Sequence, residues 1–201
     1  MNGKRYITID RQYGSGGLEV AKIVAGRLGI PYYGQEIMEQ MAKEKGISLS
    51  DLEKLDEKRT GSFLHDLSLY VFGFQNYDRM MEPFDVHKEA DAIIRKLAAQ
   101  GPCVLIGRCA DEALRESGQA LNLFICASSI DERKRRIHEV DQVPMEESEE
   151  ALHKKDRQRA EYYHYFTGRH WGVSDNYDAC LNTTTFGYEG CADIILNMME
   201  H

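Results

Sequence analysis

A short run of small residues near the start of the chain is a candidate for binding phosphate. The run separates a β-branched, alternating stretch from a stretch with helical periodicity. Glycines let a backbone curl around a phosphate without Cβ clashes, and the free N–H groups at a helix N-terminus favour an anion. From the loop alone, a tight strand-to-helix turn is an equally good interpretation. The candidate phosphate-binding residues are Gly14, Ser15, Gly16, Gly17, Leu18 and Glu19.

The loop departs from the Walker A pattern GxxxxGK[ST] at the positions that carry charge and bind magnesium. When Gly16 is aligned with the second glycine of the pattern, Gly17 stands at the lysine position and Leu18 at the hydroxyl position. Arg11 stands at the position of the first glycine. It is a candidate catalytic cation in place of the lysine, and a solvated surface arginine is an equally good interpretation. Asp10 is a candidate magnesium ligand acting through water, or a cap of the loop.

The composition limits the classes of function. The chain has 201 residues, 42% of them hydrophobic, and a net charge of −8, which argues against an extended basic surface for nucleic acid. No stretch approaches eighteen consecutive apolar residues, so no membrane span is expected. The N-terminus lacks the apolar run of a signal peptide, and five widely spaced cysteines indicate free thiols rather than a zinc site. These features predict a cytoplasmic protein with a single domain, residues 1–201.

Short apolar strands alternate with helices along most of the chain, which predicts a parallel sheet covered by helices on both faces. Strands are expected at residues 5–10, 30–33, 103–106, 121–127 and 177–182. Helices are expected at residues 18–28, 36–45, 150–169 and 187–200, with one more that begins at the capping-box sequence Ser129-Ile-Asp-Glu132. This order places the glycine loop between the first strand and the first helix.

The segment 48–100 differs from the rest because it is helix-forming and has no clear strand. It predicts helices at about 51–58, 61–81 and 85–100, rich in aromatic residues and methionine. Such a stripe is more often core or a dimer face than a cofactor site. The segment therefore predicts a helical insertion through which two copies could form a homodimer.

Several motifs follow one another in a recognisable order along nearly the whole chain. They are ITIDRQYGSGG, CVLIGRCADEAL, LNLFICASSIDERKRRI, DRQRA and NTTTFGYEGCADIILNMM. In these motifs the chain resembles the cytidylate kinase-like family of P-loop NTPases. The resemblance implies an α/β, three-layer P-loop NTPase fold with a parallel sheet of about five strands flanked by helices. It also implies an ATP-dependent nucleotide kinase, using Mg²⁺ with ATP, whose partner is a nucleoside monophosphate or a similar small acceptor.

The resemblance assigns roles to residues on both sides of the transferred phosphate. Arg108, in the GRC motif, matches an arginine that holds the acceptor monophosphate. Asp156 and Arg159, three residues apart on one helix face, match residues that contact the cytosine end of the acceptor. Arg133 and Arg136 match basic lid residues that close over the transferred phosphate, which makes them catalytic candidates.

The chain also departs from the family pattern on the acceptor side. Gly34 and Cys109 stand where the family has aspartates, and Asp111 is a candidate acceptor-binding residue in place of the second aspartate. Leu152 stands where the family has an arginine. These departures weaken the expectation of cytosine specificity more than the expectation of phosphoryl transfer.

Two regions of the chain are expected to have distinct roles. Residues 48–100 are expected to form an acceptor-side helical insertion that lies outside the simple family pattern, and residues 129–169 a lid-type helical region. Because the loop lysine is absent, an alternative function is a catalytically weak or inactive regulatory protein that binds a nucleotide or another anion. The retained arginines favour the kinase, because a bare sensor would not need an acceptor clamp and a lid.

Overall fold

The computed structural model describes residues 3–46, 48–49 and 83–200. The helices expected at about 51–58 and 61–81, and with them most of the expected insertion and dimer face, lie outside the described residues. Among the described residues, none of the helices combines the length and the hydropathy that a membrane span requires.

In the described part of the chain, five parallel strands form one sheet in the order β2-β3-β1-β4-β5. The strands are β1 Tyr6–Arg11, β2 Tyr32–Tyr33, β3 Cys103–Ile106, β4 Ala120–Cys126 and β5 Ala179–Asn182. In the central strand, Ile9 pairs with Ile106 of β3, and Arg11 pairs with Ile125 of β4. The carboxyl ends of the three central strands therefore meet at one edge, where ligands bind in open α/β sheets.

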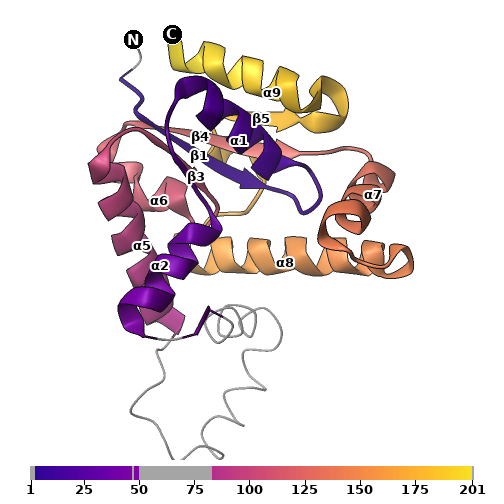
Figure 1. Cartoon of the computed structure of the whole chain (residues 1–201), viewed down its shortest axis with the longest axis horizontal. Helices are drawn as coiled ribbons and strands as arrows, with labels where there is room; N and C mark the ends of the chain where they lie inside the picture. Colours follow the sequence, from indigo (N-terminus) through magenta and orange to yellow (C-terminus); the bar gives the residue numbers. More distant parts are fainter. Residues whose placement is uncertain (1–2, 47, 50–82, 201) are drawn as a thin grey trace, which may run out of the picture.

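Helices cover both faces of the sheet, so the molecule has three layers (Figure 1). One layer consists of α1 Gly17–Leu28 and α9 Thr183–Glu200. The other layer consists of α2 Gln35–Lys45, α5 Pro83–Gln100 and α6 Ala110–Ala113. The fold class and the two covering layers agree with the sequence-based expectation.

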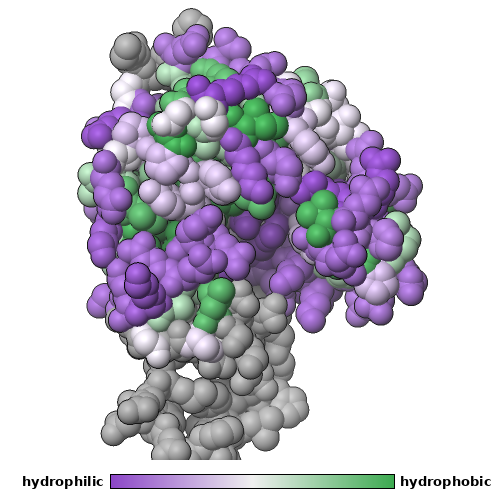
Figure 2. Space-filling view, in the orientation of Figure 1, coloured by the Kyte–Doolittle hydropathy of each residue, from purple (hydrophilic) through white to green (hydrophobic). Residues whose placement is uncertain are grey.

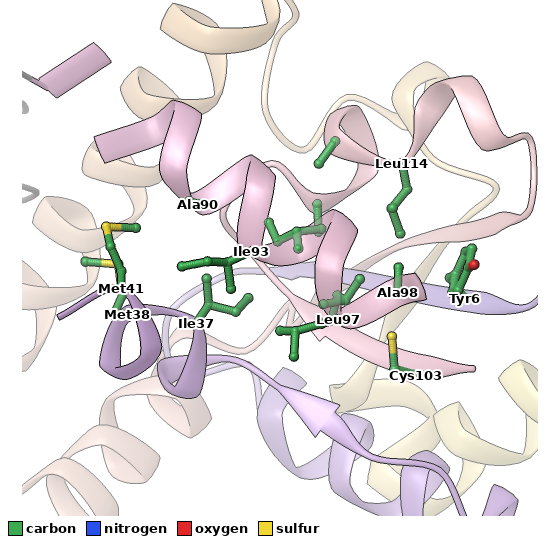
Figure 3. Packing of buried hydrophobic residues seen from close by; sticks show 14 of the residues in the cluster. Tyr6, Ile37, Met38, Met41, Ala90, Ile93, Leu97, Ala98, Cys103 and Leu114 are labelled. Carbon is green, nitrogen blue, oxygen red and sulfur yellow. The ribbon is translucent and has the colours of Figure 1, made fainter. Parts of the chain in front are cut away.

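The alternation of side chains along β1 supplies both cores. Ile7 and Ile9 pack with α1 and α9, whereas Tyr6 packs in the opposite layer. Figure 3 shows this opposite layer, where Ile37 of α2 and Ile93 of α5 lie in one apolar cluster. Both faces of the sheet are therefore packed against helices, and residues at the ends of such strands are positioned more precisely than residues on a loop.

Two further helices, α7 Ile130–Asp141 and α8 Ser148–Thr167, lie beyond the carboxyl edge of the sheet (Figure 1). Ser129 caps α7 as its sequence predicts, and its Oγ accepts a hydrogen bond from the backbone N–H of Glu132 at 3.2 Å. Short 3₁₀ turns occupy Arg115–Ser117, Met145–Glu147 and Ser174–Asn176. Because α8 runs along the carboxyl edge, its residues face the ends of the strands.

Most element bounds agree with the sequence to within two residues, and α9 is the main exception. The helix begins at Thr183, four residues before the expected start. Gly187 has a non-helical conformation, with φ 64° and ψ 179°, and divides a first short turn from the long remainder. The predicted helix is therefore the part that follows this kink.

Candidate functional site

The loop between β1 and α1 brings the predicted phosphate-binding residues to the carboxyl edge of the sheet. Gly14 and Gly16 both have left-handed backbone conformations, with φ of 73° and 78°. Ser15 folds back on the loop, and its Oγ donates to the carbonyl of Gln12 at 2.8 Å. No side chain caps α1, because its N-cap residue is Gly16. The start of the helix thus offers backbone N–H groups and a positive dipole end to an anion.

Both left-handed glycines are also contact points with other elements. A Cβ at Gly14 would lie 2.7 Å from the carbonyl oxygen of Arg133 in α7. A Cβ at Gly16 would lie 2.3 Å from the ring of Tyr188 in α9. Thr183, also in α9, donates its hydroxyl to a carbonyl of the loop at 2.8 Å. The loop is therefore enclosed by α7 and α9, which leaves its glycines no room for side chains.

An ion pair between α7 and α8 holds the loop at Tyr13. The backbone N–H of Tyr13 donates to Asp156 at 2.7 Å, and its carbonyl accepts from Nε of Arg133 at 2.8 Å. Nη2 of Arg133 and Oδ2 of Asp156 are 2.5 Å apart, and Arg133 is only 8% exposed. These two residues, the Arg133–Asp156 clamp, position the loop. The lid role expected for Arg133 and the base contact expected for Asp156 stay predictions.

A cleft of about 310 Å³ lies at the carboxyl ends of β1 and β3, between α2 and α8. Figure 2 shows hydrophilic residues around a hollow between the body that carries the sheet and the lobe that contains α7. Among the described residues, the charged lining of the cleft has four cationic side chains and one carboxylate, namely Arg11, Arg108, Lys155, Arg159 and Asp10. This excess of positive charge suits a ligand with more than one negative charge.

Arg11, the last residue of β1, extends from the start of α1 to the end of β3. Its Cβ and Cγ would lie 2.6 Å and 2.9 Å from a Cβ at Gly17, and its Nη1 would lie 2.2 Å from a Cβ at Gly107. Burial, followed by the nearby charge of Arg159, lowers the pKa of Arg11 to about 9, so the guanidinium is still charged at neutral pH. Arg11 therefore lines the cleft and is not a solvated surface residue.

Asp10 is the carboxylate in the cleft lining. Its Oδ1 accepts a hydrogen bond from the backbone N–H of Arg11 at 2.9 Å and lies 3.7 Å from Nη1 of the same residue. Burial raises the pKa of Asp10, and the charges of Arg11 and Arg159 oppose that rise.

The donor set at Asp10 limits how magnesium could bind. Within residues 3–46, 48–49 and 83–200, no group of three or more His, Cys, Asp and Glu side chains could hold a metal ion. A magnesium ion that arrives with the phosphates of a nucleotide keeps several waters and needs few protein carboxylates. Asp10 fits this limited role through a water molecule.

Arg159 and Arg108 enter the cleft from α8 and from the turn after β3. Nη1 of Arg159 donates to the carbonyl of Arg11 at 2.8 Å, and its guanidinium lies 5.7 Å from the ring centre of Tyr13. Burial lowers the pKa of Arg159. Arg108 has a left-handed backbone, with φ 58°, and its guanidinium lies 5.9 Å from the ring centre of Tyr162. A non-glycine residue in this conformation is uncommon and often marks a binding or catalytic site.

Asp111, Arg136 and Glu19 lie outside the cleft lining. Asp111 is buried and accepts hydrogen bonds from the hydroxyl of Tyr163 at 2.7 Å and from Nη2 of Arg169 at 2.8 Å. Since Tyr163 does line the cleft, Asp111 supports the wall from behind. Arg136 forms an ion pair with Glu19 in the first turn of α1. The direct ligand contacts expected for these three residues stay predictions.

Three contributors to the site carry little signal in the sequence. Tyr188 and Thr183 belong to the motif NTTTFGYEG, but nothing in that motif indicates that they contact the glycine loop. Gly107 follows a predicted strand, and its left-handed φ of 70° is typical of a glycine in a turn. Its contact with the Arg11 guanidinium depends on how β1 and β3 pair, which only the fold shows.

Comparisons with known proteins cover nearly the whole chain. The chain is 25% identical over 199 residues to the cytidylate kinase of Pyrococcus horikoshii, covering 98% of this chain and 90% of that protein. The crystal structure of an uncharacterised protein from Eubacterium ventriosum aligns with a TM-score of 0.73 at 24% identity, covering 98% of this chain and 99% of that chain. A shikimate kinase from Bacteroides thetaiotaomicron aligns with a TM-score of 0.57 at 12% identity, covering 98% of each chain.

The likeness to the shikimate kinase shows that the fold is shared with a kinase. The family is shown by a different comparison, because a model of the cytidylate kinase-like family matches residues 6–185. This match runs from the first residue of β1 into the first turn of α9. The chain therefore belongs to the cytidylate kinase-like family.

Proposed function

We propose that the protein is an ATP-dependent nucleotide kinase that transfers a phosphoryl group to a nucleoside monophosphate or a similar small phosphorylated acceptor. One observation carries this proposal: Arg11, Arg108 and Arg159 gather in a cleft beside a glycine loop and an uncapped helix start. Membership of the cytidylate kinase-like family supports the same reaction.

The two halves of the site suit two phosphate groups. The N–H groups at the start of α1 would hold the phosphates of the donor, and Arg108 and Arg159 would hold the phosphate of the acceptor. An oxygen of the acceptor phosphate attacks the terminal phosphorus of ATP, the bond from that phosphorus to the bridging oxygen breaks, and ADP leaves. Holding both partners in line and neutralising the charge on the transferred group are the main sources of rate in such reactions.

The remaining lining of the cleft suits the rest of a nucleotide. Met38, Tyr162 and Trp171 form apolar and aromatic parts of the wall, against which a sugar or a base could pack. Magnesium held by the ATP phosphates would neutralise part of their charge, with Asp10 as a partner through water. The apolar and aromatic wall supports a nucleotide acceptor over a bare inorganic anion.

The test is ADP release from Mg-ATP by the purified protein against a panel of nucleoside monophosphates and nucleosides. We expect release with at least one monophosphate. Arg108→Ala should lower kcat/KM about 100- to 1,000-fold, since it removes a charged group from the acceptor phosphate. Arg135→Ala, at an exposed arginine of α7, is the matched control and should leave kcat/KM unchanged. No release with any member of the panel would contradict the proposal.

A second candidate function is a regulatory protein that binds a nucleotide or another anion without turnover. Gly17 at the lysine position favours this function, because a P-loop without its lysine lacks a charge-assisted contact to the phosphates. Thermal stabilisation by ATP without ADP release, measured in the same samples, would identify it. Sustained ADP release that Arg108→Ala abolishes would exclude it.

A further inference from the structure

Arg11 and Gly17 show an exchange of residue types relative to the Walker A pattern: the cation stands where the pattern has glycine, and glycine stands where the pattern has the cation. The pattern GxxxxGK[ST] has glycine at its first position and lysine at its seventh. In this chain the first position is Arg11 and the seventh is Gly17. β1 ends at Arg11 and α1 begins at Gly17, so the two residues stand on either side of the loop.

Contacts between the two residues explain why only one of them carries a side chain. A Cβ on Gly17 would lie 2.6 Å from Cβ and 2.9 Å from Cγ of Arg11, closer than nonbonded carbons approach. The Cβ of Arg11 is fixed by the backbone of β1 and cannot rotate away. Gly17 is also a helical residue and is not among the glycines with positive φ, so its backbone does not require glycine. Packing against Arg11 is what requires it.

A second glycine makes room for the head of Arg11. A Cβ on Gly107 would lie 2.2 Å from Nη1 of Arg11. The backbone N–H of Gly107 donates to the carbonyl of Ile9 at 3.0 Å, which fixes the turn after β3 beside the end of β1. Gly17 and Gly107 therefore form the two ends of a slot. The Arg11 side chain lies along this slot, and its guanidinium lines the same cleft as Arg108 and Arg159.

We propose that Arg11 replaces the loop lysine as the cation that binds the transferred phosphoryl group, in the slot formed by Gly17 and Gly107. The inference rests on the proposed kinase reaction and names the residue that supplies the missing charge. In the Walker A pattern the cation stands in the first turn of the helix, whereas in this chain it stands at the end of the central strand. From there it approaches the phosphoryl group from the side of the acceptor, so the loop remains functional without its lysine.

The test exchanges the two side chains. Arg11→Gly should lower kcat about 100-fold or more while changing the KM of the acceptor much less, because the lost contact forms with the group in transfer. Gly17→Lys should also lower kcat, because its side chain collides with Arg11. The double variant R11G/G17K restores the first glycine and the lysine of the Walker A pattern, with Leu18 still at the hydroxyl position, and should exceed the kcat of R11G at least about 10-fold. A double variant no better than the poorer single variant would overturn the proposal.

A binding measurement separates this inference from the proposed function. The affinity for inorganic tripolyphosphate, measured by calorimetry, should weaken about 10- to 100-fold in R11G, as loss of a charged hydrogen bond predicts, and return in the double variant. If no acceptor gives ADP release, the kinase proposal fails and these affinities alone decide the role of Arg11. Equal affinities of the wild type and R11G, or no binding by the wild type, would overturn the inference.

A stability measurement tests the steric part alone. Gly17→Ala should lower the melting temperature in the wild-type background, because its Cβ meets Arg11. In the R11G background the same change should be neutral or stabilising, since alanine is favoured over glycine in a helix. An equal effect of Gly17→Ala on the melting temperature in both backgrounds would contradict the steric contact between Arg11 and a side chain at position 17.

Discussion

Because of the Arg133–Asp156 clamp, we predict that Arg133 stabilises the protein far more than Arg135, two residues further along α7. Arg133→Ala removes the 2.5 Å ion pair with Asp156 and the 2.8 Å hydrogen bond to the Tyr13 carbonyl. Breaking a buried pair costs about 3–5 kcal/mol. The side chain of Asp156 keeps 19% exposure, so water can solvate it in the variant, and the lower figure of about 3 kcal/mol applies.

Urea unfolding measures this cost, with the fluorescence of Trp171, the one tryptophan in the sequence, as the probe. A loss of about 3 kcal/mol corresponds to a fall in melting temperature of about 6–12 °C for a chain of this size. Arg135→Ala is the matched control, because Arg135 is 66% exposed and pairs with Glu139 at 4.0 Å. It should cost about 0.3–0.5 kcal/mol. If the two variants differ by less than about 1 kcal/mol, the clamp does not hold the loop as described.

Three further variants test contacts around the site by urea unfolding. Gly16→Ala should lower the free energy of unfolding by about 1–3 kcal/mol, because φ at Gly16 is 78° and the Tyr188 ring lies 2.3 Å from the new Cβ. Gly26→Ala is its control: the new Cβ has open space around it, and the free energy of unfolding should be unchanged or rise by up to about 1 kcal/mol. Tyr163→Phe should cost about 1–3 kcal/mol, since it removes a hydrogen bond to the buried Asp111, and an unchanged midpoint would contradict this. Burial raises the pKa of Asp10, so the folded state holds this proton more tightly than the unfolded state does. The wild type should therefore lose stability relative to Asp10→Asn as pH rises above 3.8, and a wild type that gains stability relative to Asp10→Asn over that range would refute the shift.

The elements of the fold that local sequence determines were predictable, and those that depend on tertiary contacts were not. β3 agrees with its predicted bounds, because a Gly-Pro turn precedes Cys103–Ile106 and Gly107 follows it. The start of α9 differs because Thr183 donates its hydroxyl to carbonyls of the loop and of β4, which draws a helical turn forward. The expected strand at 177–182 contains Cys180, whose side chain is exposed because β5 lies at an edge of the described sheet.

Some parts of the candidate site were also predictable from local sequence, and others depend on tertiary contacts. The glycine loop and the helix that follows it are visible in the sequence, because left-handed turns and helix starts have local signatures. The partnership of Arg133 with Asp156 is not visible, since the two residues are far apart in sequence and meet only through the packing of α7 on α8. Likewise, the collision between Arg11 and a side chain at position 17 depends on how closely the strand passes the helix. Comparison with the Walker A motif shows only that the lysine is missing. The contacts around Gly17 show that Arg11 fills the space that a side chain at position 17 would need.

The contacts of α8 predict weak selection among the bases of the acceptor. Asp156, which matches a cytosine-contacting residue, gives both carboxylate oxygens to the Tyr13 backbone and to Arg133, so a base contact would compete with two existing bonds. Arg159 donates to the carbonyl of Arg11 and lies among the cationic residues that line the cleft. Selection then depends on the phosphate more than on the base, and kcat/KM for the four common monophosphates should agree within about tenfold, equivalent to about 1.4 kcal/mol. Rates of ADP release across the panel measure this spread. A preference for cytidine monophosphate above about 100-fold would show that the clamp opens, or that other residues of the cleft read the base.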